Sequence, residues 1–197
     1  MARLTTSFVL GYHGCEREIG EAVVSGGKRL KSSESAYHWL GAGTYFWEAD
    51  PRRALEWAEE RPGKRALKAP FVLGAVIDTR NCLDLRTRED VELVKLAFQL
   101  LKAETAATGL EMPVNQVAPN DKSPAKVMRY LDFAVVDRLH QLVQETGREA
   151  FDTVRALFAE GEEIYPGSGF REKTHSEIAV RNDACIIGFF RPRENLS

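Results

Sequence analysis

Three short stretches, far apart in the chain, each place one chemically useful side chain at the edge of an expected strand. They contribute the imidazole of His13, the phenol of Tyr45 and the carboxylate of Glu177. Strand edges can bring side chains from distant segments to a single cleft. In such a cleft a carboxylate can stabilise a developing positive charge, an aromatic ring can stack on a flat ligand, and an imidazole can donate to a hydroxyl. The joint pattern therefore favours one shared site.

Glycines accompany two of these side chains. Gly14 directly follows His13 and has no Cβ, so a ligand can approach its backbone closely. Gly41 and Gly43 precede Tyr45. The stretch around them lacks the Lys-Ser/Thr pair or the third glycine of a phosphate-binding loop, which excludes a standard nucleotide-binding motif here.

The ordered set of motifs resembles that of the ADP-ribosyltransferases with a His-Tyr-Glu triad, a group that includes the poly(ADP-ribose) polymerases and the diphtheria-like toxins. The resemblance consists of His-Gly at the end of an early strand, Gly-x-Gly-x-Tyr-Phe at residues 41–46, and a glutamate opening a late strand. It implies cleavage of the bond between ribose and nicotinamide in NAD, the co-substrate. One ADP-ribose would then pass to a macromolecular acceptor, protein or nucleic acid.

The resemblance also implies a role for each residue. Glu177 would accept the ribose 2′-hydroxyl and stabilise the ribosyl cation, while His13 would donate to a ribose hydroxyl and position the sugar. The backbone of Gly14 would clamp the carboxamide, and Tyr45 would stack on the nicotinamide ring. Trp57 stands twelve positions after Tyr45, where a second aromatic wall is expected, and buried core is an equal alternative for it. No metal is expected.

Other functions stay open at this point. Within the enzymes, an NAD glycohydrolase and an NAD-dependent RNA 2′-phosphotransferase are the nearest rivals. A non-enzymatic module that binds NAD, nucleic acid or protein is the alternative from another class. A zinc site from His13, Cys15, His38 and His175 has spacings that match no metal motif, and a Cys15 nucleophile has no support. The resemblance suggests a toxin or phage-defence effector, with an antitoxin or inhibitor protein as a partner.

Composition places further bounds on the class of protein. The chain has 197 residues and a net charge of -2, which suits a single domain over residues 1–197 and no general basic field for nucleic acid. No secretory signal or membrane-spanning run is visible, so no membrane partner is expected. Three cysteines without a Cys-x-x-Cys pair argue against a disulfide framework and favour a cytoplasmic location: Cys15, Cys82 and Cys185.

The elements that must position the site are an α/β (α+β) set. We expect a split, mostly antiparallel core of two small sheets with an NAD cleft between them, and a helical layer or insertion at about 87–158. Turn-rich residues 165–175 precede Glu177 and are expected to contact the acceptor. Strands are predicted at 7–12, 44–47, 71–77, 176–181 and 185–190, the last two joined by a hairpin-like turn, and helices at 16–24, 51–60, 87–101, from Ser123 onward, and after Gly147 to Phe158.

Overall fold

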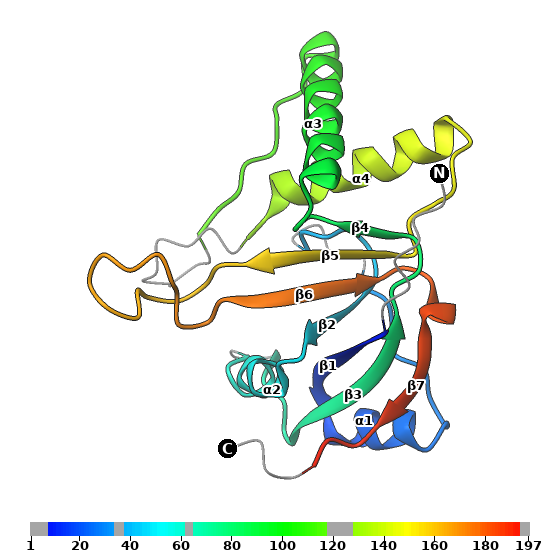
Figure 1. Cartoon of the computed structure of the whole chain (residues 1–197), viewed down its shortest axis with the longest axis vertical. Helices are drawn as coiled ribbons and strands as arrows, with labels where there is room; N and C mark the ends of the chain where they lie inside the picture. The colour runs from blue at the N-terminus through cyan, green and yellow to red at the C-terminus, as the bar shows by residue number, and fades with distance from the viewer. Residues whose placement is uncertain (1–7, 34–37, 62–64, 118–127, 194–197) are drawn as a thin grey trace.

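The computed structural model describes residues 8–33, 38–61, 65–117 and 128–193. Within these ranges seven strands form one sheet, accompanied by four α-helices (Figure 1). The strands are β1 (Phe8–Glu16), β2 (Thr44–Glu48), β3 (Pro70–Asp78), β4 (Cys82–Asp84), β5 (Thr153–Phe158), β6 (His175–Val180) and β7 (Ile186–Phe190). The helices are α1 (Arg17–Val24), α2 (Pro51–Glu59), α3 (Arg88–Thr108) and α4 (Tyr130–Glu145).

The sheet has the order β4-β5-β6-β2-β1-β3-β7, and every neighbouring pair is antiparallel except β4–β5. The expected mixed α+β class is confirmed. The expectation of two separate small sheets is wrong, because β1 and β2 are paired. The pairing between β1 and β2 is short, however, with only two residue pairs, whereas all nine residues of β1 pair with β3. The sheet is therefore continuous but weakly joined at its centre.

Local sequence signals explain the helix ends. The Asp50 carboxylate accepts from the backbone N–H of Arg53 at 2.9 Å, and Pro51 opens α2, as predicted. The Thr87 hydroxyl caps α3, and Gly109 ends it with φ of 69°, a left-handed conformation that favours glycine. None of the helices in the described ranges is both long and apolar enough to cross a bilayer.

The helical layer ends earlier than predicted. Residues 153–158 form β5 rather than a helix, because Val154 and Ala156 alternate with Arg155 in the two-residue period of a strand. The helices α3 and α4 are instead the crossover that joins the parallel strands β4 and β5. The predicted helix start at Ser123 lies outside the described residues, and α4 begins at Tyr130.

The predicted hairpin between β6 and β7 is also wrong. A short 3-10 turn, Asp183–Cys185, follows β6, and the chain then crosses to the far edge of the sheet. There β7 pairs with β3, while β6 lies between β5 and β2 (Figure 1). This placement puts β6, which carries Glu177, directly beside β2, which carries Tyr45.

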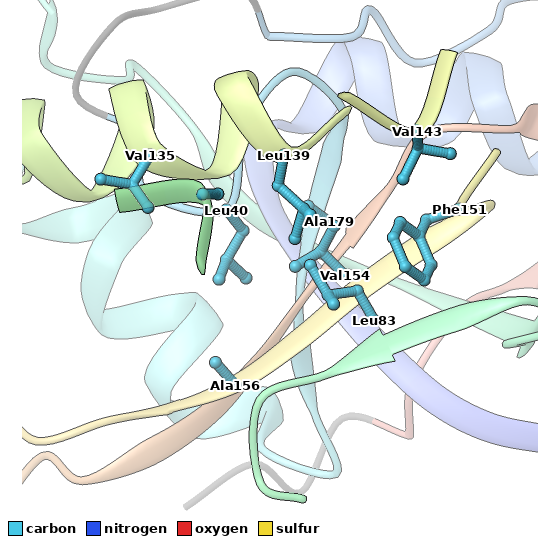
Figure 2. Close-up of a cluster of buried hydrophobic side chains, with 10 residues drawn as sticks. Leu40, Leu83, Val135, Leu139, Val143, Phe151, Val154, Ala156 and Ala179 are labelled. Atoms are coloured by element: carbon cyan, nitrogen blue, oxygen red, sulfur yellow. The ribbon is translucent and has the colours of Figure 1, made fainter. Parts of the chain in front are cut away.

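Helix α4 covers one face of the β4-β5-β6-β2 half. A buried cluster joins the helix to the strands beneath it (Figure 2). The ring of Tyr45 packs against the same cluster, so this face of β2 is the face that α4 covers. Two positions further along β2, Trp47 packs against Ala54 of α2. The helices α2 and α4 therefore flank the same face of the sheet. The cluster contains Leu83, Val154, Ala156 and Ala179 from strands and Val135, Leu139 and Val143 from α4.

Candidate functional site

The hydrogen-bond ladder between β1 and β2 stops early. Its last residue pair is Tyr12 with Trp47, and in an uninterrupted ladder the next hydrogen-bonded pair would join Gly14 to Tyr45. The Tyr45 carbonyl instead accepts a hydrogen bond from His13 Nδ1 at 2.8 Å. The imidazole thus replaces a strand-to-strand bond at the point where the two strands separate.

Gly14 presents its backbone to this break. Backbone direction alternates along a strand, so the N–H and C=O of Gly14 face the side that β2 has left. Helix packing requires that this position has no side chain. A Cβ at Gly14 would collide with the Ala54 carbonyl oxygen and lie 3.1 Å from the Ala58 Cβ, both on α2. Glycine is therefore needed here for fold as well as for any ligand.

A cavity of about 250 Å³ opens beside the break. All four of the predicted side chains line it: His13, Tyr45, Trp57 and Glu177. The structure thus brings together residues that are up to 164 positions apart in the sequence. Further aromatic walls come from Trp39, Trp47 and Phe158, which sequence reasoning did not assign to the site.

Glu177 is held through both carboxylate oxygens. Its Oε2 accepts from the indole Nε1 of Trp39 at 2.6 Å, and its Oε1 lies 3.2 Å from Nε2 of His175. The side chain is 15% exposed, so it is mostly buried yet reaches the cavity. The only feature of the sequence that could have assigned Trp39 to the site is that it is a tryptophan in an otherwise polar loop. His175 lies two residues before Glu177, and that spacing puts both on one face of β6.

The protonation of His13 follows from its surroundings. Burial lowers the pKa of this imidazole; the hydrogen bond to the Tyr45 carbonyl opposes the change, and the charge of Arg61 adds to it. A neutral ring that donates from Nδ1 has its lone pair on Nε2. His13 can therefore accept a hydrogen bond from a ligand hydroxyl, whereas the sequence analysis expected it to donate one.

Tyr45 offers its ring rather than its hydroxyl. The hydroxyl donates to the Gly41 carbonyl at 2.8 Å and accepts from the Leu40 N–H at 2.9 Å. Burial raises the pKa of Tyr45, and the charge of Glu177 adds to this effect, so the phenol stays neutral. The ring of His38 lies 4.8 Å away, tilted by 54°. Because the hydroxyl is committed to the loop, only the aromatic surface is available for stacking.

Trp57 is packed on both sides. Its ring lies 5.4 Å from that of Trp47, and the guanidinium of Arg61 sits 4.6 Å above it. Such a cation–π contact stiffens the wall and brings positive charge to the margin of the cavity. Lys31 also lines the cavity, and Arg53 is paired there with Glu160 at 2.8 Å. The cavity thus combines aromatic walls with a charged floor and margin.

The geometry lends no support to a Cys15 nucleophile or to a metal site. Burial raises the pKa of Cys15 to about 11, which keeps the thiol protonated and unreactive. No group of three or more histidine, cysteine, aspartate or glutamate side chains comes together to hold a metal within the described ranges. His13, His38 and His175 all have aromatic or carbonyl neighbours instead.

Residues 165–174, in the segment between β5 and β6, do not line the cavity. Tyr165 and Phe170 are 56% and 68% exposed, and neither lines the cavity. The segment is anchored to α2, because the Lys173 ammonium donates to the Glu60 carboxylate at 2.7 Å. It therefore presents aromatic side chains to solvent beside the strand that carries Glu177, as the acceptor-loop hypothesis requires.

Comparison of the chain with protein-family models, with curated proteins and with solved structures finds no match.

Proposed function

We propose that this protein is a mono-ADP-ribosyltransferase that cleaves NAD at the bond between nicotinamide and ribose. The observation that carries the proposal is the break in the β1–β2 ladder. Beside it, one cavity is lined by the imidazole of His13, the aromatic ring of Tyr45 and the carboxylate of Glu177. Gly14 is not among the lining residues, but it follows His13 on the strand edge where the pairing with β2 has ended. The motif resemblance and the geometry thus support the same site independently of one another.

The break suits a carboxamide. The N–H of Gly14 is a donor and its C=O an acceptor, and a carboxamide carries one of each in the same spacing. A buried backbone edge without a strand partner needs such a ligand or water. The cavity has the size of a flat heteroaromatic ring with its sugar. The nicotinamide riboside half of NAD would therefore enter, with the diphosphate at the margin near Lys31 and Arg61.

The chemistry requires charge stabilisation more than covalent participation. The bond between C1′ and the nicotinamide nitrogen breaks, and its electron pair leaves with nicotinamide, now neutral. C1′ becomes cationic and then bonds to the acceptor nucleophile, which loses its proton to solvent. The Glu177 carboxylate, which lines the cavity, would accept the 2′-hydroxyl more strongly as positive charge builds on the ring. His13 Nε2 would accept a ribose hydroxyl and orient the sugar.

The decisive experiment measures nicotinamide release from NAD by the wild-type protein and by Glu177→Gln. The amide keeps the size of the side chain and removes its charge, so release should fall by about 10²–10³-fold. Unfolding in urea is the control for folding. Equal release by both proteins would remove Glu177 from the mechanism, and no release by the wild type would favour a binding module.

A second measurement finds the acceptor. Labelled NAD is added to a lysate with the wild-type protein, and the label is separated into protein and nucleic-acid fractions. We expect label in one macromolecular fraction and none with Glu177→Gln. Nicotinamide release with no labelled macromolecule would instead identify an NAD glycohydrolase. If the product damages an essential molecule, induced expression should slow bacterial growth, and Glu177→Gln should relieve it.

A further inference from the structure

The contacts of His175 define where its protons lie. Both ring nitrogens face oxygen atoms that accept hydrogen bonds. Nδ1 lies 2.6 Å from the carbonyl oxygen of Lys173, and Nε2 lies 3.2 Å from Oε1 of Glu177. A carbonyl cannot donate, so Nδ1 must carry a proton. A further proton must then lie between Nε2 and the carboxyl group, because two lone pairs would otherwise face each other.

The contacts favour placing the shared proton on the imidazole. The Glu177 carboxylate also accepts the indole N–H of Trp39 at 2.6 Å, so two donors then face its two oxygens. An imidazolium at His175 satisfies both of its oxygen neighbours.

The ring is fixed in this orientation by aromatic packing. His175 is buried, with only 5% of its surface exposed, and its ring stacks on Phe158 at 5.5 Å with an angle of 24°. The ring of Trp47, on β2, also lies 6.3 Å from the His175 ring. Phe158 and Trp47 both line the cavity, whereas His175 does not. The histidine is thus behind the cavity wall and reaches the site only through Glu177.

We propose that His175 is a positioning residue, whose imidazolium holds the Glu177 carboxylate ionised and aimed into the cavity. This inference rests on the proposed function for its kinetic consequence, though not for its proton assignment. A carboxylate has about four lone-pair positions, of which His175 and Trp39 occupy one on each oxygen. The remaining positions are free for the ribose 2′-hydroxyl. Fixing the carboxylate from behind removes the need to reorganise it as the ribosyl cation forms.

Two amide substitutions separate this role from simple packing. In His175→Gln the side-chain amide nitrogen stands where Nε2 was and can still donate to Glu177. In His175→Asn it stands where Nδ1 was and can donate only to the Lys173 carbonyl. We expect His175→Asn to lower kcat for nicotinamide release by about ten- to a hundredfold, the value of one hydrogen bond to a charged group, with KM for NAD nearly unchanged. His175→Gln should recover most of that loss.

Equal losses in the two variants, or a larger loss in His175→Gln, would overturn the proposal in favour of packing. Urea unfolding of both variants shows whether either has lost its fold. A loss confined to KM would also contradict the proposal, because a group behind the wall should act on the reaction step and not on binding.

Nitrogen-15 NMR of the wild-type ring tests the proton assignment without any activity. At neutral pH we expect both His175 nitrogens to be protonated, and one of them to lose its proton in Glu177→Gln, because the amide can donate to Nε2. A neutral His175 in the wild type would overturn the proposal. If the wild type releases no nicotinamide, the proposed function fails while this measurement still decides the state of His175.

Discussion

Replacing Trp39 by phenylalanine should impair the reaction while leaving the fold intact. The change removes one donor, the indole Nε1 that lies 2.6 Å from Glu177 Oε2. The aromatic contact with Phe158, at 5.2 Å between ring centroids, is largely kept. The contact with the Arg129 guanidinium, which lies 5.5 Å from the Trp39 ring, is also largely kept. The perturbation therefore acts on one hydrogen bond to a charged group.

The size of the effect follows from that bond. A hydrogen bond to a charged group contributes about 1.5–3 kcal/mol, and about 1.4 kcal/mol corresponds to a tenfold change. If the bond is needed in full when the ribosyl cation forms, Trp39→Phe should lower kcat for nicotinamide release by about ten- to a hundredfold. The free energy of unfolding should fall much less, because Glu177 stays partly exposed and water can replace the indole.

Trp47→Phe is the matched control. Trp47 lines the same cavity, and its indole nitrogen has no hydrogen-bond partner among the described residues. The same chemical change there keeps the hydrogen bond between Trp39 and Glu177, so kcat should fall less than in Trp39→Phe. If both variants lose activity equally, the effect belongs to aromatic packing. If Trp39→Phe releases nicotinamide at the wild-type rate, the bond to Glu177 has no part in the reaction.

Three further predictions concern binding, pH and the acceptor. Tyr45→Ala should weaken NAD binding in calorimetry more than Tyr45→Phe, and equal, wild-type-like affinities would show that the ring does not stack. Tyr45→Phe should still lower the free energy of unfolding by about 1–3 kcal/mol, because the Leu40 N–H and the Gly41 carbonyl lose their hydrogen-bond partner. Burial lowers the pKa of His140 to about 3, so the unfolded chain takes up this proton first, and stability should fall as pH falls from about 6.5 toward 3. His140→Leu should make urea-unfolding free energies less dependent on pH in that window, and an unchanged slope would refute this assignment. Phe170→Ala with Arg171→Ala should reduce transfer to a macromolecule and spare hydrolysis of NAD, since neither side chain lines the cavity; proportional loss of both activities would place the segment in the NAD site or the fold.

Signals that act over a few residues were readable from the sequence. The Asp50 and Thr87 caps depend on contacts within about one helical turn, so residue types sufficed to place the starts of α2 and α3. The end of α3 was predicted at residue 101, whereas the helix continues to Thr108 and Gly109 ends it. The ordered motifs around His13, Tyr45 and Glu177, and the family resemblance that they carry, led to the expectation of one shared site, and all three side chains line one cavity.

Strand partners were decided by the tertiary structure. Residues 153–158 were predicted as helix, although they alternate buried Val154 and Ala156 with Arg155 in a strand. A six-residue apolar stretch that follows two helices fits either period until its neighbours are known. The predicted hairpin between β6 and β7 was wrong because the neighbours of a strand could not be read from its own residues. Both strands exist, but they pair with different partners.

The finer chemistry of the site also came only from the fold. The donors that hold Glu177 are Trp39, which is 138 positions away, and His175, whose proximity in sequence did not reveal a hydrogen bond. The role proposed for His13 changed from donor to acceptor, because its Nδ1 donates to the Tyr45 carbonyl. The sequence by itself determined which functional groups are present and the strands that carry them. Protonation and orientation depend on burial and on contacts between distant segments, and these are properties that only the packed chain possesses.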